Sequence, residues 1–118
     1  MRLDSGYLRI INNFLHDVAT GTWIACGLVI WLLSGRVAGI PAEAAAALGS
    51  AMLAVFNLAL VSLVVVGATG GVRLGYWRRE TDAPDIAKKR RALLVKHGTF
   101  FLVYGLGTAW FWMLVRGA

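Results

Sequence analysis

Three uncharged, largely apolar runs dominate the pattern of hydrophobic and polar positions along the chain. They extend over residues 18–35, 44–72 and 97–115. A helix rises roughly 1.5 Å per residue, so each run is about as long as a helix needs to cross the hydrocarbon core of a bilayer. The pattern predicts an all-α fold, an integral membrane three-helix bundle with spans over about residues 12–35, 42–72 and 92–115. All three spans belong to a single transmembrane domain, residues 1–118.

The segments outside these runs are polar or contain helix breakers. Gly39 and Pro41 predict an external turn between the first two spans. Residues 73–91 predict a basic cytoplasmic loop before the third span. Residues 1–12 fit either a short helix in the membrane interface or the first turns of the first span, and the sequence leaves both open.

Helical spacing identifies the faces that should pack against protein. Counting in steps of three and four from His16 gives a face with small and polar residues, which is typical of helix contacts in membranes. Its members are Thr20, Trp23, Gly27, Ile30 or Trp31, and Ser34. The same count from His97 gives Phe101, Tyr104, Thr108, and Phe111 or Trp112. Asn57 lies mid-span, where an unpaired amide is costly, so we expect it to bond to a neighbouring helix.

The composition supports a membrane location. Hydrophobic residues make up 58% of the chain and charged residues 15%, compared with roughly 25% charged in soluble domains. The net charge of +6 could suggest nucleic acid as a partner, but ten of the twelve basic residues precede the first span or lie between the second and third. That asymmetry is the one the positive-inside rule describes. We expect a multi-pass protein of the bacterial cytoplasmic (inner) membrane, with the N-terminus cytoplasmic, the C-terminus periplasmic, the lipid bilayer as partner and no nucleic acid bound.

Two histidines are the main candidates for chemistry. His16 opens the first span and His97 the third, and these spans run in the same direction, so both rings should enter the cytoplasmic half of the membrane at similar depth. An ionisable residue inside a span is a functional-site hypothesis by default. The pattern favours a b-type haem with His16 and His97 as its two axial ligands. In the ordinary alternative, each histidine is an interfacial residue whose ring reaches headgroups or a backbone carbonyl.

Residues at the same depth could complete a haem site. Gly70 and Gly71 end the second span with no side-chain bulk, so a porphyrin face could approach the backbone there. Basic residues could pair with the propionates, and aromatic residues could form the walls. These further cofactor-binding candidates are Arg73, Lys96, Trp23 and Tyr104. Helices in contact lie about 8–10 Å apart, too close for a porphyrin between two histidines, so a splayed pair, an intervening helix or ligation across subunits would be required.

Two other functions compete with haem binding. Copper suits imidazole and thioether ligands, but Met1, Met52 and Met113 are scattered along the chain. A cofactor-free structural subunit is the other alternative. Small residues at Gly27, Gly49, Gly105 and Gly107 offer close-packing faces, so we expect association with other membrane subunits or as a homo-oligomer in any case. The sequence contains no nucleophile with a base, no phosphate loop and no zinc-ligand spacing, so we do not expect independent catalytic activity.

Three segments resemble the CopD-like membrane proteins, a group that includes the copper-resistance D proteins and is similar in layout to the HemJ-type protoporphyrinogen oxidases. They are FLHDVATGTWIACGLVIWLL, TGGVRLGYW and RRALLVKHGTFFLV. The resemblance implies roles in haem binding and activity for His16 and Lys96, the early histidine and the later lysine of the pattern. The chain departs from the family in its three spans and in His97, which directly follows that lysine. These departures favour a haem-anchoring, electron-transfer subunit of a larger complex over copper transport or oxidase activity.

Overall fold

Three long helices form the whole of the described fold in the computed structural model. It describes residues 5–80 and 86–117, with the side chains of residues 6–74 and 90–117. The helices are α1 (Ser5–Ser34), α2 (Ala42–Glu80) and α3 (Ile86–Gly117). Each contains a stretch long and apolar enough to cross a membrane, namely Gly6–Ser34, Ala42–Leu74 and Arg90–Gly117. The prediction of an all-α fold with three long apolar helices is confirmed.

The helix ends answer one question that the sequence left open. Helix α1 is continuous from Ser5, so residues 5–12 are its first turns and not a separate interfacial helix. Gly39 has a φ of +84°, a value that favours glycine, in the turn before α2. Helix α2 continues to Glu80 and α3 begins at Ile86, so most of the segment expected to be a loop, residues 73–91, extends the two helices. Residues 81–85 of that segment lie outside the described residues.

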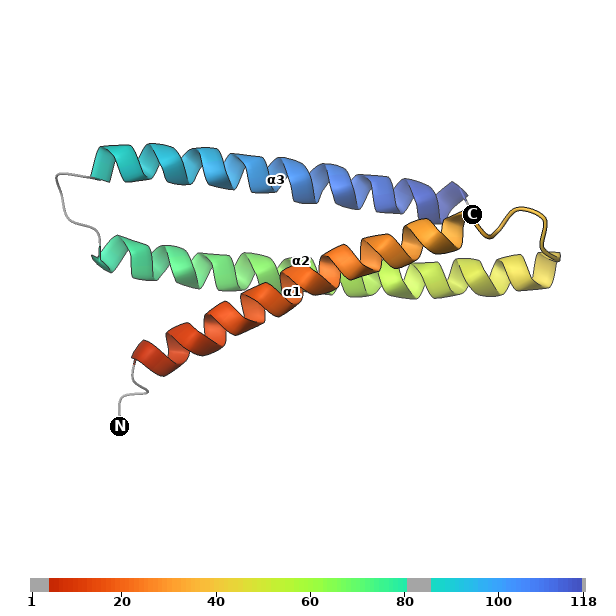
Figure 1. Ribbon diagram of the computed structural model, residues 1–118, viewed down its shortest axis with the longest axis horizontal. Helices are drawn as coiled ribbons and strands as arrows, with labels where there is room; N and C mark the ends of the chain where they lie inside the picture. Colours follow the sequence, from red (N-terminus) through yellow and green to blue (C-terminus); the bar gives the residue numbers. More distant parts are fainter. Residues whose placement is uncertain (1–4, 81–85, 118) are drawn as a thin grey trace.

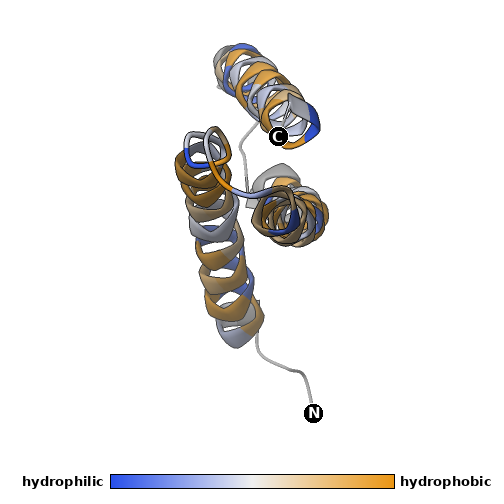
Figure 2. Cartoon of the chain, turned by 90° about the vertical axis from the view of Figure 1, so that its right-hand side faces the viewer, coloured by the Kyte–Doolittle hydropathy of each residue, from blue (hydrophilic) through white to orange (hydrophobic). Residues whose placement is uncertain are grey.

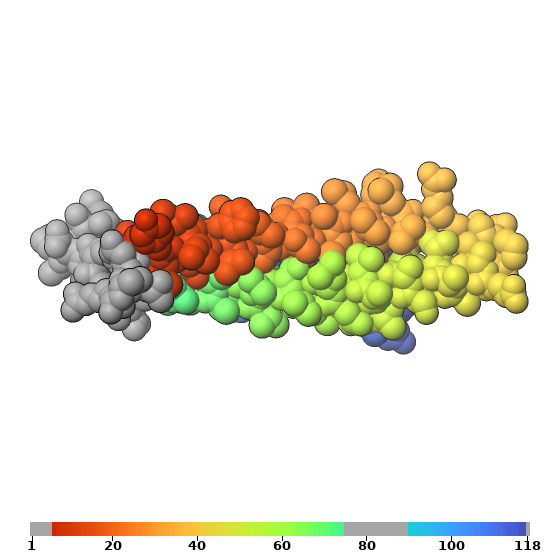
Figure 3. All heavy atoms as spheres, turned by 90° about the horizontal axis from the view of Figure 1, so that it is seen from below, coloured from red at the N-terminus to blue at the C-terminus, as the bar shows by residue number. Residues whose placement is uncertain are grey.

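The helices run up, down and up in a thin arrangement (Figure 1). Helix α1 crosses α2 diagonally and approaches α3 only toward its own C-terminal end, so the N-terminal halves of α1 and α3 diverge. The contact between α1 and α2 is the most extensive, and Figure 3 shows these two helices packed along each other. The overall extents are 63 × 35 × 14 Å. Helix α1 lies over α2 along the shortest axis (Figure 3), and α3 lies beside them, so each helix leaves much of its surface uncovered.

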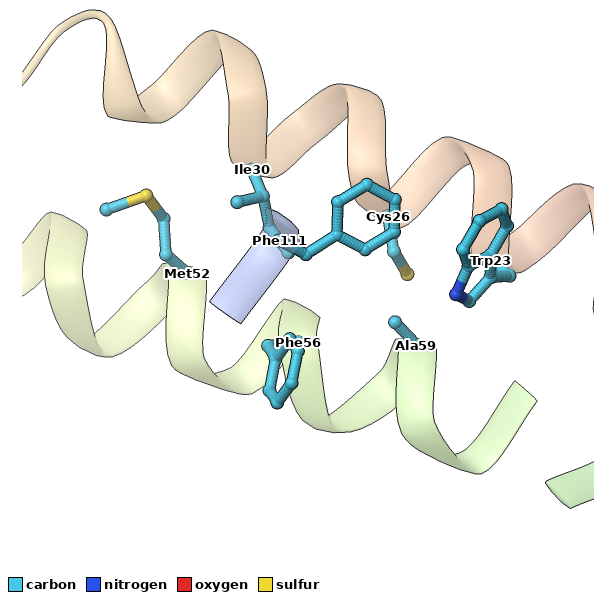
Figure 4. Close-up of a cluster of buried hydrophobic side chains, with 7 residues drawn as sticks. All are labelled: Trp23, Cys26, Ile30, Met52, Phe56, Ala59 and Phe111. Atoms are coloured by element: carbon cyan, nitrogen blue, oxygen red, sulfur yellow. The ribbon is translucent and has the colours of Figure 1, made fainter. Parts of the chain in front are cut away.

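A small hydrophobic cluster joins all three helices where they meet (Figure 4). Ile30 of α1 and Met52 of α2 are completely buried in this cluster. Cys26 is also buried in this cluster, where it packs among the apolar side chains. The other members of the cluster are Trp23, Phe56, Ala59 and Phe111.

Helices α1 and α3 contact each other through two reciprocal pairs of an aromatic ring and a glycine. The Phe111 ring of α3 occupies the space that a side chain on Gly27 would need. The Trp23 indole of α1 does the same at Gly107, where an added Cβ would lie 2.7 Å from Trp23 Cη2. Within each helix the ring and the glycine are one turn apart, so two parallel helices interlock in a single register. Close packing is therefore confirmed at Gly27 and Gly107, whereas an added Cβ at Gly49 or Gly105 would meet nothing within 4 Å.

Apolar side chains cover most of the remaining surface of the three helices, as the hydropathy colouring of Figure 2 shows. Only 6% of the most apolar window of α3 is buried, compared with 28% in α1 and in α2. In water such a surface would drive aggregation, whereas in a bilayer lipid tails can cover it. The structure therefore fits a multi-pass membrane protein that contacts the lipid bilayer.

Candidate functional site

A polar face on α1 is the best-defined candidate site. It consists of Asn12, His16, Thr20 and Trp23, which lie three or four residues apart and so share one side of the helix. Each of them makes a hydrogen bond to α2 or α3. His16, Thr20 and Ser34 are half-buried and Trp23, Gly27 and Ile30 are buried, so the protein-packed face predicted by counting from His16 is confirmed.

The His16 ring is fixed by a threonine of α2. Its Nδ1 lies 2.8 Å from Thr69 Oγ1. The Thr69 hydroxyl also lies 2.7 Å from the carbonyl oxygen of Val65, to which it donates its single hydrogen. We therefore assign Thr69 Oγ1 as the acceptor and His16 Nδ1–H as the donor of the bond between them. The imidazole also has a hydrogen-bond interaction with the backbone of Val66. With the proton on Nδ1, Nε2 carries the lone pair.

His97 is held in the same tautomer by its own helix. Its Nδ1 lies 2.8 Å from the carbonyl oxygen of Leu93, one turn earlier in α3. A carbonyl can only accept, so Nδ1 carries the proton and Nε2 the lone pair. No hydrogen bond in the described part of the chain joins His97 to α1 or α2. His16 is thus hydrogen-bonded to α2, whereas His97 is hydrogen-bonded only within α3 among the described residues. The N-terminal half of α3, which contains His97, diverges from α1 (Figure 1).

The two glycines at the end of the second predicted span differ in their surroundings. An added Cβ on Gly70 would lie 3.9 Å from Cε1 of His16, so this glycine faces the imidazole. An added Cβ on Gly71 would meet nothing within 4 Å. Neither glycine interrupts α2, which is helical throughout this region. The backbone beside His16 therefore remains unobstructed by side chains of α2 at these two positions.

Charged side chains from all three helices interact with His16. Arg73 of α2, Lys96 of α3 and Asp17 of α1 all interact electrostatically with the imidazole. Lys96 also places its Nζ 5.8 Å from the centre of the Phe100 ring, within the range of a cation–π contact. Arg73 and Lys96 therefore bring positive charge toward His16 from two different helices.

Trp23 and Tyr104 lie between α1 and α3. Trp23 is buried and its Nε1 donates a 3.0 Å hydrogen bond to Thr108 Oγ1. Its ring meets that of Tyr104 edge-on, with centroids 4.8 Å apart. The Tyr104 hydroxyl lies 3.4 Å from Thr20 Oγ1. Both aromatic residues are predicted walls of a cofactor site, and in the structure they belong to the contact between α1 and α3. This contact lies one to two helical turns after His16 along α1, at Thr20 and Trp23.

The predicted face of α3 is confirmed only in its second half. Phe111 is buried, and Tyr104 and Thr108 are half-buried. Phe101, in contrast, is exposed. The reason is the divergence of α1 and α3, which leaves the first half of α3 without a neighbour on that side (Figure 1).

Sequence reasoning missed two polar partners of this site. Asn12 donates through Nδ2 to the carbonyl oxygen of Thr69, 3.0 Å away. It lies four residues before His16, so helical spacing alone could have placed it on the same face. Nothing in the sequence could have identified Thr69 as the partner of His16, because that pairing depends on the register between α1 and α2.

Searches beyond the chain identify no relative. No protein-family model, no curated protein and no solved structure matches this sequence. Among the described residues, no group of three or more histidine, cysteine, aspartate or glutamate side chains is arranged to hold a metal ion. The candidate site therefore consists of two imidazoles with lone pairs on Nε2, a cationic surrounding and two accessible glycines.

Proposed function

We propose that this protein binds a b-type haem in the cytoplasmic half of the membrane and transfers electrons within a larger membrane complex. His16 and His97 would supply the axial ligands through Nε2. The observation that carries this proposal is the shared tautomer of the two rings, in which Nδ1–H is bound to protein and Nε2 carries the lone pair. Histidines that ligate metals are commonly oriented in this way, because the bond at Nδ1 fixes both the tautomer and the ring direction.

The surroundings of His16 fit a haem in two respects. Arg73 and Lys96 bring positive charge from two helices, and carboxylates such as haem propionates form their strongest hydrogen bonds with such cations. Gly70 and Gly71 leave the backbone of α2 approachable beside the ring. The bound haem would supply one-electron redox chemistry, while the protein would set the potential through its axial ligands and the burial of the site.

The divergence of α1 and α3 bears on whether two histidines can share one porphyrin. Helices in contact lie about 8–10 Å apart, which leaves no room for a porphyrin between them. The N-terminal halves of α1 and α3, which carry His16 and His97, are not in contact in this way (Figure 1). We propose that the haem is held between these halves.

We also propose the orientation and location that the charge pattern predicts. The basic residues before the first span and between the second and third would keep the N-terminus and the α2–α3 connection in the cytoplasm. With three spans, the C-terminus would then face the periplasm of a bacterial inner membrane.

A cofactor-free structural subunit is the second candidate function. The hydrogen bonds from Asn12 and His16 to Thr69 tie α1 to α2, which is a sufficient role for a buried polar face in a membrane protein. Copper handling has less support. Met52 is completely buried in the hydrophobic cluster, and Met113 is exposed on α3.

The absorption spectrum of the full chain, purified from haem-replete membranes, tests the proposed function. The wild-type protein should give a reduced-minus-oxidised haem b signal that is lost in His16→Ala and in His97→Ala. Asn12→Ala is the matched control, since it removes a neighbouring bond to Thr69 and keeps both imidazoles, and it should retain the signal. A haem signal that survives both histidine substitutions would show that the ligand assignment is wrong. A wild-type protein without haem would favour the structural subunit.

A further inference from the structure

The side of α2 that faces away from α1 and α3 carries a polar residue near the middle of the membrane. Asn57 lies near the centre of the candidate span Ala42–Leu74. Its side chain is exposed, and it makes no hydrogen bond with any described part of the chain. The expectation that Asn57 bonds to a neighbouring helix is therefore not met within one copy. In a bilayer this position faces hydrocarbon, where an amide with no partner costs free energy.

The side of α2 around Asn57 carries small residues toward the N-terminal end of the helix and larger apolar residues toward its C-terminal end. Successive steps of three or four residues place them in one stripe along the helix, and all of them are exposed. We call this stripe the outward face of α2. Its members are Ala46, Ser50, Leu53, Ala54, Asn57, Leu60, Val61, Val64 and Ala68. The buried residues of α2, such as Met52, Ala59 and Val66, lie on the opposite side of the helix.

From this placement we infer that the outward face of α2 binds the same face of a second copy of the chain, with Asn57 hydrogen-bonded to its own counterpart. Two copies inserted in the same orientation have parallel α2 helices. A two-fold axis normal to the membrane then brings each residue of the face opposite itself. A carboxamide contains both a donor and an acceptor, so two facing Asn57 side chains satisfy each other reciprocally.

The identity of the partner follows from that self-complementarity. A second copy necessarily presents an amide at the same depth, whereas an unrelated helix would need a polar residue placed there independently. Small side chains at Ser50 and Ala54 also suit a self-pairing, because in a parallel pair every residue must fit against its own equivalent. A single polar residue in such a seam fixes the register of the two helices. This dimer does not depend on the proposed haem, since His16 and Thr69 lie at the contact with α1.

Disulfide cross-linking of the full chain in its own membrane tests the geometry. The background is Cys26→Ala, which removes the single native cysteine. Ser50→Cys lies on the outward face and should give a disulfide-linked dimer on oxidation. Leu106→Cys is the matched control, because Leu106 is also exposed but lies on α3, away from the outward face of α2. It should cross-link much less.

Substitution of Asn57 then tests the energetics. In detergent or vesicles, Asn57→Leu should raise the dissociation constant of the dimer about tenfold, the order expected for a hydrogen bond between membrane helices. Asn57→Gln keeps the amide and should stay within about threefold of the wild type. Since Asn57 lies outside the hydrophobic cluster, neither change alters the packing of one copy. Equal cross-linking of Ser50→Cys and Leu106→Cys, an unchanged dissociation constant for Asn57→Leu, or a Ser50→Cys adduct with a protein of different mass would each overturn the inference.

Discussion

At the scale of single residues, Thr69 is the most informative position of the candidate site. Its side chain is buried, accepts from His16 Nδ1 and donates to a carbonyl of its own helix. Its own carbonyl oxygen accepts from Asn12. One threonine therefore orients the imidazole and ties α1 to α2. A histidine in a membrane span could be predicted from the sequence, but the residue that holds it could not.

Two substitutions of Thr69 should separate the contribution of its hydrogen bond with His16 to stability from the contribution of side-chain packing. Thr69→Val keeps the shape and removes the hydroxyl, so His16 Nδ1 loses its partner. We expect the variant to be less stable by about 1 kcal/mol, the order found for hydrogen bonds between membrane helices. Thr69→Ser keeps the hydroxyl and should lose less stability than Thr69→Val. Unfolding of the purified chain in mixed detergent micelles measures both, and equal losses for the two variants would argue against a stabilising bond to His16.

At the scale of the elements, the contact between α1 and α3 depends on two rings that fit over two glycines. Trp23 covers Gly107, and Phe111 covers Gly27. The sequence predicted that glycines at these positions offer close-packing faces, but it could not predict which ring meets which glycine. That choice depends on the register and crossing of two helices far apart in the chain.

A side chain at Gly107 should weaken this contact. In Gly107→Ala, the new Cβ would lie 2.7 Å from Trp23 Cη2, so the indole or the helices must shift. Gly105→Ala is the matched control, because its Cβ would meet nothing within 4 Å. We expect Gly107→Ala to be less stable than Gly105→Ala by about 2 kcal/mol.

A double substitution tests whether the loss of stability in Gly107→Ala comes from its contact with Trp23. Trp23→Phe removes the part of the indole nearest to Gly107, so the cost of Gly107→Ala should be smaller in the Trp23→Phe background. Purely additive losses in a double-mutant cycle would show that the ring and the glycine do not interact as described.

At the scale of the whole molecule, the number of long apolar helices could be predicted, but their full length and their arrangement could not. Uncharged runs reveal spans because a bilayer excludes charge, so the predicted start at residue 42 agrees with α2 at Ala42. The continuation of α2 to Glu80 was missed, because polar residues can be helical outside the membrane. The divergence of α1 from α3 was also missed, and with it the exposure of Phe101, because crossing angles depend on three-dimensional packing.

The orientation of the molecule in the membrane remains a prediction with a direct test. Alkaline phosphatase fused to the C-terminus should be active, since it folds only outside the cytoplasm, and a green fluorescent protein fused there should be dark. The reason is the concentration of ten of the twelve basic residues on one side of the spans. The opposite pair of signals would show that the charge bias does not set the topology of this chain.

The spin state of a bound haem iron tests the central claim most directly, because it reports how many strong ligands the protein supplies along the haem axis. In the ferric wild-type protein, the electron paramagnetic resonance spectrum should show low-spin iron with two imidazole ligands. His16→Ala and His97→Ala should each convert any remaining haem to a high-spin form. Low-spin iron that persists in either variant, or a wild-type protein that binds no haem, would contradict the assignment of His16 and His97 as axial ligands.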